Sequence, residues 1–190
     1  MPIVLFLGRD VKEYESESAE IIKLYINEGN IRCEKCLLPM AKHSKYKRLI
    51  KETGSQITII VVWCSKCKVW HALLPDFLLP YKHYSGNEIE SVIIDSGLEP
   101  VSHIETKASE GTVRRWIKQI GTRITQAISV LKYLFRRAGQ AVSEVAIETG
   151  PEYSELEQIL EMAPSSVKCS GNKLGLANIW LGTNAMAVYI

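Results

Sequence analysis

Four of the five cysteines form two pairs with the spacing C-x2-C, and only Cys169 stands apart. Cys33 and Cys36 make the first pair, and Cys64 and Cys67 make the second after a gap of 27 residues. Zn²⁺ takes four thiolates in a closed tetrahedron, and each C-x2-C turn presents two sulfur atoms. We therefore expect these four cysteines to hold one structural zinc ion.

Other uses of the two cysteine pairs fit the sequence less well. A redox dithiol would lie at the start of a helix in a thioredoxin-like βαβ context, which surrounds neither pair. Structural disulfides need an oxidising compartment, whereas "MPIVLFLGRD" lacks the basic segment and cleavage site of a signal peptide. A catalytic zinc ion needs an open position, which four thiolates do not leave. We expect a site that stabilises a cytoplasmic protein and performs no catalysis.

The segments around the cysteine pairs must bring them together. "KYKRLIK" and "QITIIVVW" have the composition of strands, and "ETGS" between them has that of a turn, so a hairpin is expected. "KVWHALL", which follows Cys67, adds a third strand, and "MPIVLFLGRD" contains an N-terminal strand. This order of strands and cysteine turns predicts a zinc ribbon, a small antiparallel sheet.

Positive charge is concentrated in the middle of the chain. The net charge is +2, but residues 31–137 hold 18 basic and nine acidic side chains, a net charge of about +9. Such a concentration favours a polyphosphate partner through release of counterions, although a solvated surface would show the same composition. Within it, Lys45, Lys47 and Arg48 are expected to grip a DNA backbone; lysines that protect an edge strand from aggregation are the alternative.

The second half of the chain is expected to be helical and to contain a helix-turn-helix. A first helix, capped by Ser85, runs to Gly97, and a short helix with Val101 and Ile104 precedes the recognition helix. That recognition helix spans residues 109–121, with an apolar stripe on one face and polar side chains on the other. The side chains expected to contact DNA in the major groove are Thr112, Arg114, Arg115 and Lys118. An ordinary amphipathic surface helix is the alternative.

Three further segments complete the helical half. A long packed helix is predicted from Ile124 through Ala138, Val142 and Val145, and a short acidic helix lies between Pro151 and Pro164. The acidic helix suits solvent or a protein partner. The chain from residue 174 to 190 carries no charge, but glycine and asparagine interrupt it, so a buried tail is expected and not a membrane span.

The order of these parts resembles the N-terminal region of insertion-sequence transposases that begin with a zinc ribbon and a helix-turn-helix. It is more similar still to a family of uncharacterised bacterial proteins found near mobile elements. The motifs that carry the resemblance lie within residues 33–120 and are "CEKC", "KHSKYKR", "CSKC", "HALLPDFLLPYKHYS" and "GTVRRWI". The resemblance implies a bacterial origin and DNA binding, and no established activity.

Catalysis by the chain itself is not expected. Full transposases of the resembled kind carry acidic residues that converge on two metal ions, but the only aspartates here are Asp10, Asp76 and Asp95. A P-loop and a Rossmann fingerprint are also absent, because "LFLGRD" has one glycine where those motifs need several.

These observations predict an α+β protein with a zinc-ribbon domain at residues 1–80 and an all-helical domain at residues 81–190. The expected function is that of a non-enzymatic, zinc-dependent protein that binds double-stranded DNA and is associated with a mobile element. The alternatives are a zinc-ribbon adaptor that binds proteins through its acidic C-terminal helix, and a truncated transposase without independent activity.

Overall fold

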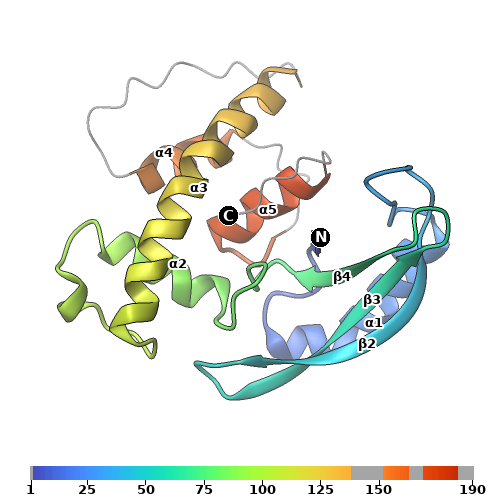
Figure 1. Cartoon of the computed structure of the whole chain (residues 1–190), viewed down its shortest axis with the longest axis horizontal. Coiled ribbons are helices and arrows are strands. Elements are labelled where there is room, and N and C mark those ends of the chain that lie inside the picture. The colour runs from blue at the N-terminus through green and yellow to red at the C-terminus, as the bar shows by residue number, and fades with distance from the viewer. Residues whose placement is uncertain (1, 138–151, 163–168, 184–190) are drawn as a thin grey trace.

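The protein combines one four-stranded sheet with helices in an α+β arrangement (Figure 1). The computed structural model describes residues 2–137, 152–162 and 169–183. In the sheet the strands lie in the order β1-β4-β3-β2, so that β2 forms one edge and β1 the other. The α+β class expected from the sequence is confirmed.

Strands β2 (Ala41–Ile50), β3 (Ser55–Cys64) and β4 (Val69–Pro75) form the antiparallel meander that the sequence predicted. β-branched residues dominate β3, the central strand of this meander, because they pack well on a pleated surface. The sheet also gains a strand that sequence reasoning did not pair: β1 (Ile3–Leu5) runs parallel to β4. A parallel pair needs a long crossover, which residues 6–68 supply.

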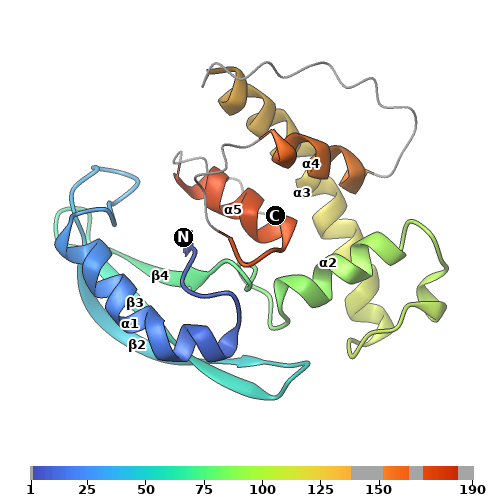
Figure 2. The same ribbon diagram turned by 180° about the vertical axis from the view of Figure 1, so that it is seen from behind.

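Helix α1 (Val11–Asn27) covers one face of the sheet (Figure 2). Its start is set by Asp10, whose carboxylate accepts a hydrogen bond from the Glu13 amide at 2.9 Å. Tyr14 and Ile22 face inward, and the Tyr14 hydroxyl donates to the carbonyl of Thr58 in β3 at 2.7 Å. The helix therefore closes a core with the sheet.

The helices of the second half pack against one another beside the sheet. They are α2 (Gly86–Asp95), α3 (Glu110–Arg137), α4 (Glu152–Glu161) and α5 (Lys173–Thr183). As expected, the Ser85 hydroxyl caps α2, accepting from the Glu88 amide at 3.2 Å. The buried apolar residues fall mainly into two clusters, one drawn from Leu7 to Leu78 and the other from Leu79 to Leu181. The leucines of "HALLPDFLLP" are buried.

The helix-turn-helix expected near residues 100–120 is not confirmed. Where a leading helix was expected, Val101–His103 form a 3-10 helix of three residues. Residues 96–109 separate α2 from α3, whereas a helix-turn-helix has a turn of about 3–4 residues. The recognition helix also does not end at Gly121, because its apolar stripe continues through Ile124 and Ile128 and holds α3 as one helix to Arg137.

The remaining predictions for this half concern its ends. α4 buries Leu156, Ile159 and Leu160, and the part of the uncharged tail that lies in α5 is largely buried, as expected for that tail. The positions Ala138, Val142, Val145, Pro151 and Pro164 and the tail from residue 184 onward lie outside the described residues. Within the described ranges, no helix combines the length and apolar character needed to span a bilayer.

Candidate metal centre and nucleic-acid interface

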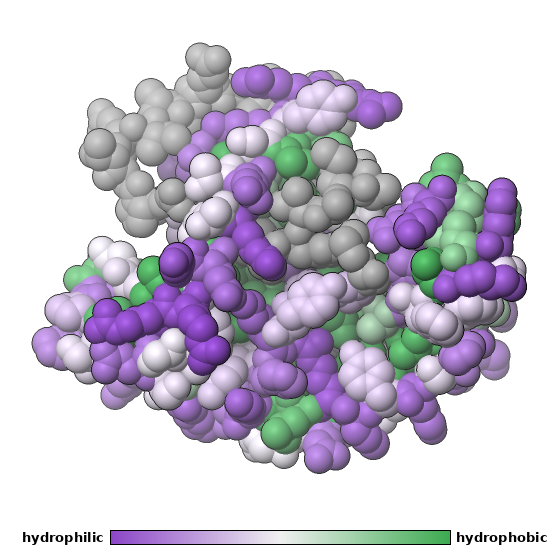
Figure 3. Space-filling view, in the orientation of Figure 1, coloured by the Kyte–Doolittle hydropathy of each residue, from purple (hydrophilic) through white to green (hydrophobic). Residues whose placement is uncertain are grey.

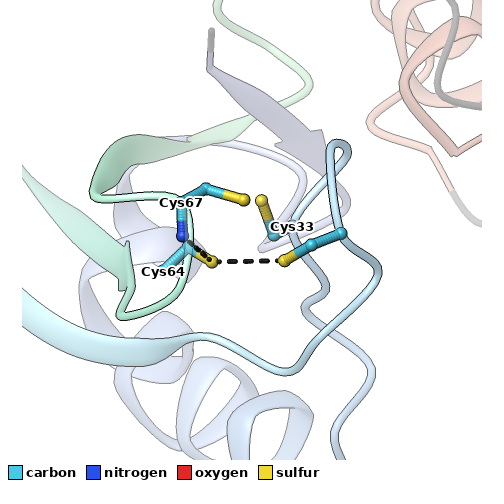
Figure 4. A group of neighbouring side chains, drawn as sticks. Cys33, Cys64 and Cys67 are labelled. Atoms are coloured by element: carbon cyan, nitrogen blue, oxygen red, sulfur yellow. Dashed lines mark hydrogen bonds between the residues drawn. The ribbon is translucent and has the colours of Figure 1, made fainter.

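The four paired cysteines meet at one end of the sheet. Their sulfur atoms all lie within 4.8 Å of one another, and the sulfurs of Cys36 and Cys64 are 3.5 Å apart. Figure 4 shows the sulfur atoms of Cys33, Cys64 and Cys67 directed toward a common centre. A disulfide would bring two sulfurs to about 2.05 Å, and all four cysteines are free thiols.

The spacing of these sulfur atoms fits a tetrahedral metal ion. With Zn–S bonds of about 2.3 Å, the edges of a regular ZnS₄ tetrahedron measure about 3.8 Å. The shortest separation given, 3.5 Å, and the upper limit of 4.8 Å for all of them are compatible with this value, and Cys33 and Cys64 are buried while Cys36 and Cys67 are half-buried. Four thiols with no carboxylate or imidazole among them make a donor set that suits zinc.

The two cysteine turns have the same backbone conformation. The amide of Leu37 donates to the carbonyl of Cys33 at 2.8 Å, and the amide of Lys68 donates to that of Cys64 at 2.9 Å. Leu37 and Lys68 are both in the left-handed region, with φ of 59° and 56°. Each turn reverses the chain directly after its second cysteine, which leaves both sulfurs of a pair on the inside.

Hydrogen bonds around the thiols shift the pKa values of two of them in opposite directions. The amide of Cys67 donates to the sulfur of Cys64 at 3.4 Å, and this bond lowers the pKa of Cys64 to about 7. The hydrogen bond between the Cys67 thiol and Cys36 raises the pKa of Cys67 to about 12. These contacts favour the thiolate at Cys64 and the protonated thiol at Cys67. A divalent cation bound by the sulfur atoms would favour the thiolate form.

An aromatic group that sequence reasoning did not identify lies beside the cysteines. Trp63 and Trp70 are cross-strand partners with ring centroids 4.6 Å apart, and the His43 ring lies 6.0 Å from Trp63. The ammonium of Lys68 lies 5.7 Å from the centre of the Trp63 ring. The signal in the sequence was "WCSKCKVW", in which two tryptophans flank the second cysteine pair. They place an intrinsic fluorophore next to the metal centre.

The predicted DNA contacts of β2 do not share one side of the sheet. Lys45 pairs with Ile60 and Lys47 with Thr58, so both lysines point to the face opposite that of Arg48. Lys45 and Lys47 are exposed, but Arg48 is only 9% exposed. Its guanidinium donates to the carbonyl of Leu79 at 2.8 Å and to the carbonyl of Lys82. Arg48 therefore holds the chain at residues 79–82 and is not presented to a DNA backbone.

The predicted contacts of α3 lie on its first turns. Arg114, Arg115 and Lys118 are exposed, on the side opposite the stripe that includes buried Val113 and Trp116. Figure 3 shows strongly hydrophilic surface gathered over this part of the molecule. Both arginines also have partners within the helix. The Arg114 guanidinium is 2.5 Å from the carboxylate of Glu110, and the Arg115 guanidinium donates to the carbonyl of Gly111 at 3.2 Å.

The remaining predicted contact, Thr112, is half-buried beside these cations. Its hydroxyl lies 2.9 Å from that of Ser109, the residue before α3. The amide of Thr112 donates to the Ser109 carbonyl at 2.8 Å. Lys82 lies before α2, and its ammonium donates to the Gln119 side chain in α3 at 2.7 Å. Lys82 therefore joins the cationic face of α3, a contact that no local pattern could show.

The fold and the cysteine site define an α+β protein with a candidate four-thiol metal centre. Residues 33–116 match the family model described as "Domain of unknown function (DUF6431)", which covers fewer than half of the 190 residues. The match begins at the first cysteine of the centre and ends at Trp116, within the first turns of α3. No curated protein and no solved structure matches the chain.

Proposed function

We propose that the protein is a non-enzymatic DNA-binding protein whose fold depends on one zinc ion. The observation that carries the DNA-binding part is the cationic face of α3, where Arg114, Arg115 and Lys118 are exposed on one helix side and Lys82 adjoins them. Cations on an exposed helical face give affinity for phosphates, and a helix of this size fits the major groove. Association with a mobile element rests on the resemblance given above.

The zinc part of the proposal is supported by the four sulfur atoms. The donors of the ion would be Cys33, Cys36, Cys64 and Cys67, and the ion would tie the loop before β2 to the turn between β3 and β4. Four thiolates would fill its coordination, so it would supply stability and offer no position to a substrate. This is the physical basis for proposing a protein without catalytic activity.

The ion pair of Arg114 does not count against DNA contact. Arg114 and Glu110 have side chains that are 65% and 56% exposed, and exposed pairs contribute only about 0–1 kcal/mol. A phosphate can therefore replace Glu110 as the partner of Arg114 at little cost. Rotation of the Arg114 side chain away from Glu110 would also bring its guanidinium toward a base edge in the major groove.

The test is binding of short DNA duplexes to the purified protein, followed by fluorescence anisotropy. Changing Arg114 to Gln should alter the ranking of duplex sequences, whereas Lys118→Gln should weaken binding to all of them alike. Lys12→Gln, at an exposed position of α1, is the matched control and should bind as the unchanged protein does. The DNA-binding part would be refuted if all variants bound DNA equally well, or if the unchanged protein bound no DNA.

The metal is tested separately. Purified protein should contain one zinc ion per chain, and Co²⁺ in its place should show thiolate charge-transfer absorption and quench the fluorescence of the adjacent tryptophans. Cys36→Ser should abolish these signals, whereas Cys169→Ser should keep them, because Cys169 packs near Val4 and Ile179 and not in the cluster. A folded protein without metal would contradict the proposal.

A protein-binding adaptor is the second candidate. Leu37, Leu38 and Trp70 are 64%, 44% and 56% exposed around the cysteine turns, and such apolar side chains suit a protein partner. The acidic helix α4 supports this candidate less, because Glu155 is occupied by Lys132 at 2.6 Å. Capture of a protein partner that survives nuclease and high salt, with no retention of DNA, would favour the adaptor.

A further inference from the structure

A cleft of about 220 Å³ lies between α3 and the turn at residues 81–84. Its walls come from three places in the sequence: the end of the β2 hairpin, the turn, and the first turns of α3. The lining residues are Lys51, Tyr81, Lys82, His83, Tyr84, Thr112, Arg115, Trp116 and Gln119. Only Thr112 and Arg115 were among the residues expected to contact DNA.

The charges of this cleft all have one sign. Lys51, Lys82 and Arg115 line it, and none of its described lining residues is an aspartate or a glutamate. Within the described ranges, none of these three cations lies within salt-bridge distance of a carboxylate. Cations brought together without a counter-charge repel one another, so the folded chain carries an electrostatic cost here that an anion would remove.

The polar groups of the cleft are held in place by other contacts. Gln119 accepts from the Lys82 ammonium at 2.7 Å, and Arg48 holds the carbonyl of Lys82 from the sheet side. The Lys51 amide donates to the carbonyl of His83 at 2.8 Å, which ties the hairpin to the turn. Under them, the rings of Tyr84 and Trp116 are in edge-to-face contact at 4.9 Å. The Lys82 ammonium and the backbone on two sides of the cleft are therefore positioned before any ligand arrives.

The electrostatics of Lys82 agree with this geometry. Burial, and then the nearby charges of Arg123 and Arg115, lower the pKa of Lys82. An anion in the cleft would act in the opposite direction and favour the charged ammonium.

We propose that this cleft binds a phosphate group, with Lys51, Lys82 and Arg115 supplying the charge and the Thr112 hydroxyl a further hydrogen bond. Guanidinium and ammonium donors around a hydroxyl make a site for phosphate oxygens. The source of the phosphate rests on the proposed function: it belongs to the backbone of bound DNA. The contact would place the first turns of α3 in register on the duplex without reading its sequence.

Gln119→Glu is the sharpest variant for the test. It sets a carboxylate next to Lys82 in an exposed position of α3, so it should pair with Lys82 and lower the positive charge of the cleft by one without disturbing the core. The melting temperature of the unchanged protein should rise when inorganic phosphate replaces chloride at equal ionic strength, and that of the Gln119→Glu variant should not. Lys82→Gln should lose the same response, and the control Lys12→Gln should keep it.

Duplex DNA forms the second arm of the experiment. Loss of one phosphate contact should weaken binding of DNA about tenfold in Lys82→Gln and in Gln119→Glu. It should also reduce the slope of log affinity against log salt by about 0.9. Lys12→Gln should change neither quantity.

The two arms separate failure of this inference from failure of the proposed function. If the unchanged protein binds no DNA but phosphate stabilises it and not Gln119→Glu, the proposed function fails and the phosphate site stands with a small phosphorylated ligand. If DNA binds with the same affinity and salt slope to every variant, the assignment of the cleft to DNA is overturned. If phosphate does not distinguish the unchanged protein from Gln119→Glu, the phosphate site itself is overturned.

Discussion

The residues that shape the metal centre are not only the cysteines. Leu37 and Lys68 stand in equivalent places, directly after the second cysteine of each pair, and both adopt positive φ. An L-residue in this region costs about 1–2 kcal/mol relative to its right-handed form. The cysteine turns need this conformation to reverse the chain, so both turns carry this conformational free-energy cost.

Leu37→Gly should therefore stabilise the protein. Leu37 has a φ of 59° and is 64% exposed, so glycine relieves the backbone and gives up little packing. The free energy of unfolding should rise by about 1 kcal/mol in denaturant titrations. Leu38→Gly is the matched control: Leu38 is exposed but has no positive φ, and the same change there should cost about 0.5–1 kcal/mol. Destabilisation by Leu37→Gly as large as that by Leu38→Gly would contradict this account.

Neighbouring basic residues of β2 should differ in what they do. Arg48→Gln leaves the carbonyls of Leu79 and Lys82 without their charged donor, a loss of about 2 kcal/mol in unfolding free energy. Lys47→Gln, one residue away on the exposed face, should stay within about 0.5 kcal/mol of the unchanged protein. Equal stability of the two variants would show that Arg48 does not hold the turn.

At the scale of elements, glycines in two helices report how each helix is packed. Gly111 lies in the first turn of α3, and a Cβ there would meet nothing within 4 Å. Gly175 lies in α5, where a Cβ would stand 2.2 Å from the carbonyl oxygen of Asp76. α5 therefore contacts the chain directly after β4 as closely as its backbone permits.

Alanine at these two positions should have opposite effects. Gly111→Ala removes conformational freedom from the unfolded chain and should raise the unfolding free energy by about 0.5–1 kcal/mol. Gly175→Ala forces α5 away from Asp76 and should lower it by about 1–3 kcal/mol. Thermal melts of the two variants, followed by circular dichroism, provide the measurement. A neutral Gly175→Ala would mean that α5 is free to shift.

At the scale of the whole molecule, the sequence passes from the first apolar cluster to the second between Leu78 and Leu79. Residues of the metal centre belong only to the first cluster, which includes Cys33 and Cys64. We expect a first domain at residues 1–80 and a second at residues 81–190. The helical domain is then expected to depend on the metal only through its contacts with the sheet.

Removal of the metal should therefore act unevenly on the chain. Metal-binding free energy is folding free energy for the part that holds the ion. A chelator should speed amide hydrogen exchange in β2, β3 and β4 much more than in α2 and along the buried face of α3. Cys36→Ser should reproduce the effect without chelator. A uniform rise in exchange along the chain would show that the two parts unfold as one.

The sequence by itself determined the parts of this protein that depend on local pattern. The C-x2-C spacing predicted the cysteine cluster because each turn places two thiols on one side, and a β-branched run with a short turn predicted the hairpin. Ser85 marked the start of α2, and the apolar periodicity of residues 113–135 marked the buried face of α3. Each depends on residues close together in the chain.

Only the tertiary structure decided what depends on distant segments. It made Arg48 a partner of the turn at residues 79–82, because burial of a side chain is a property of the whole fold. It continued α3 through Gly121, where the local signal indicated an end but the packed stripe outweighed one glycine. It also brought Lys51, Lys82 and Arg115 around one cleft. Three segments supply those charges, and no pattern within any one of them records that they meet.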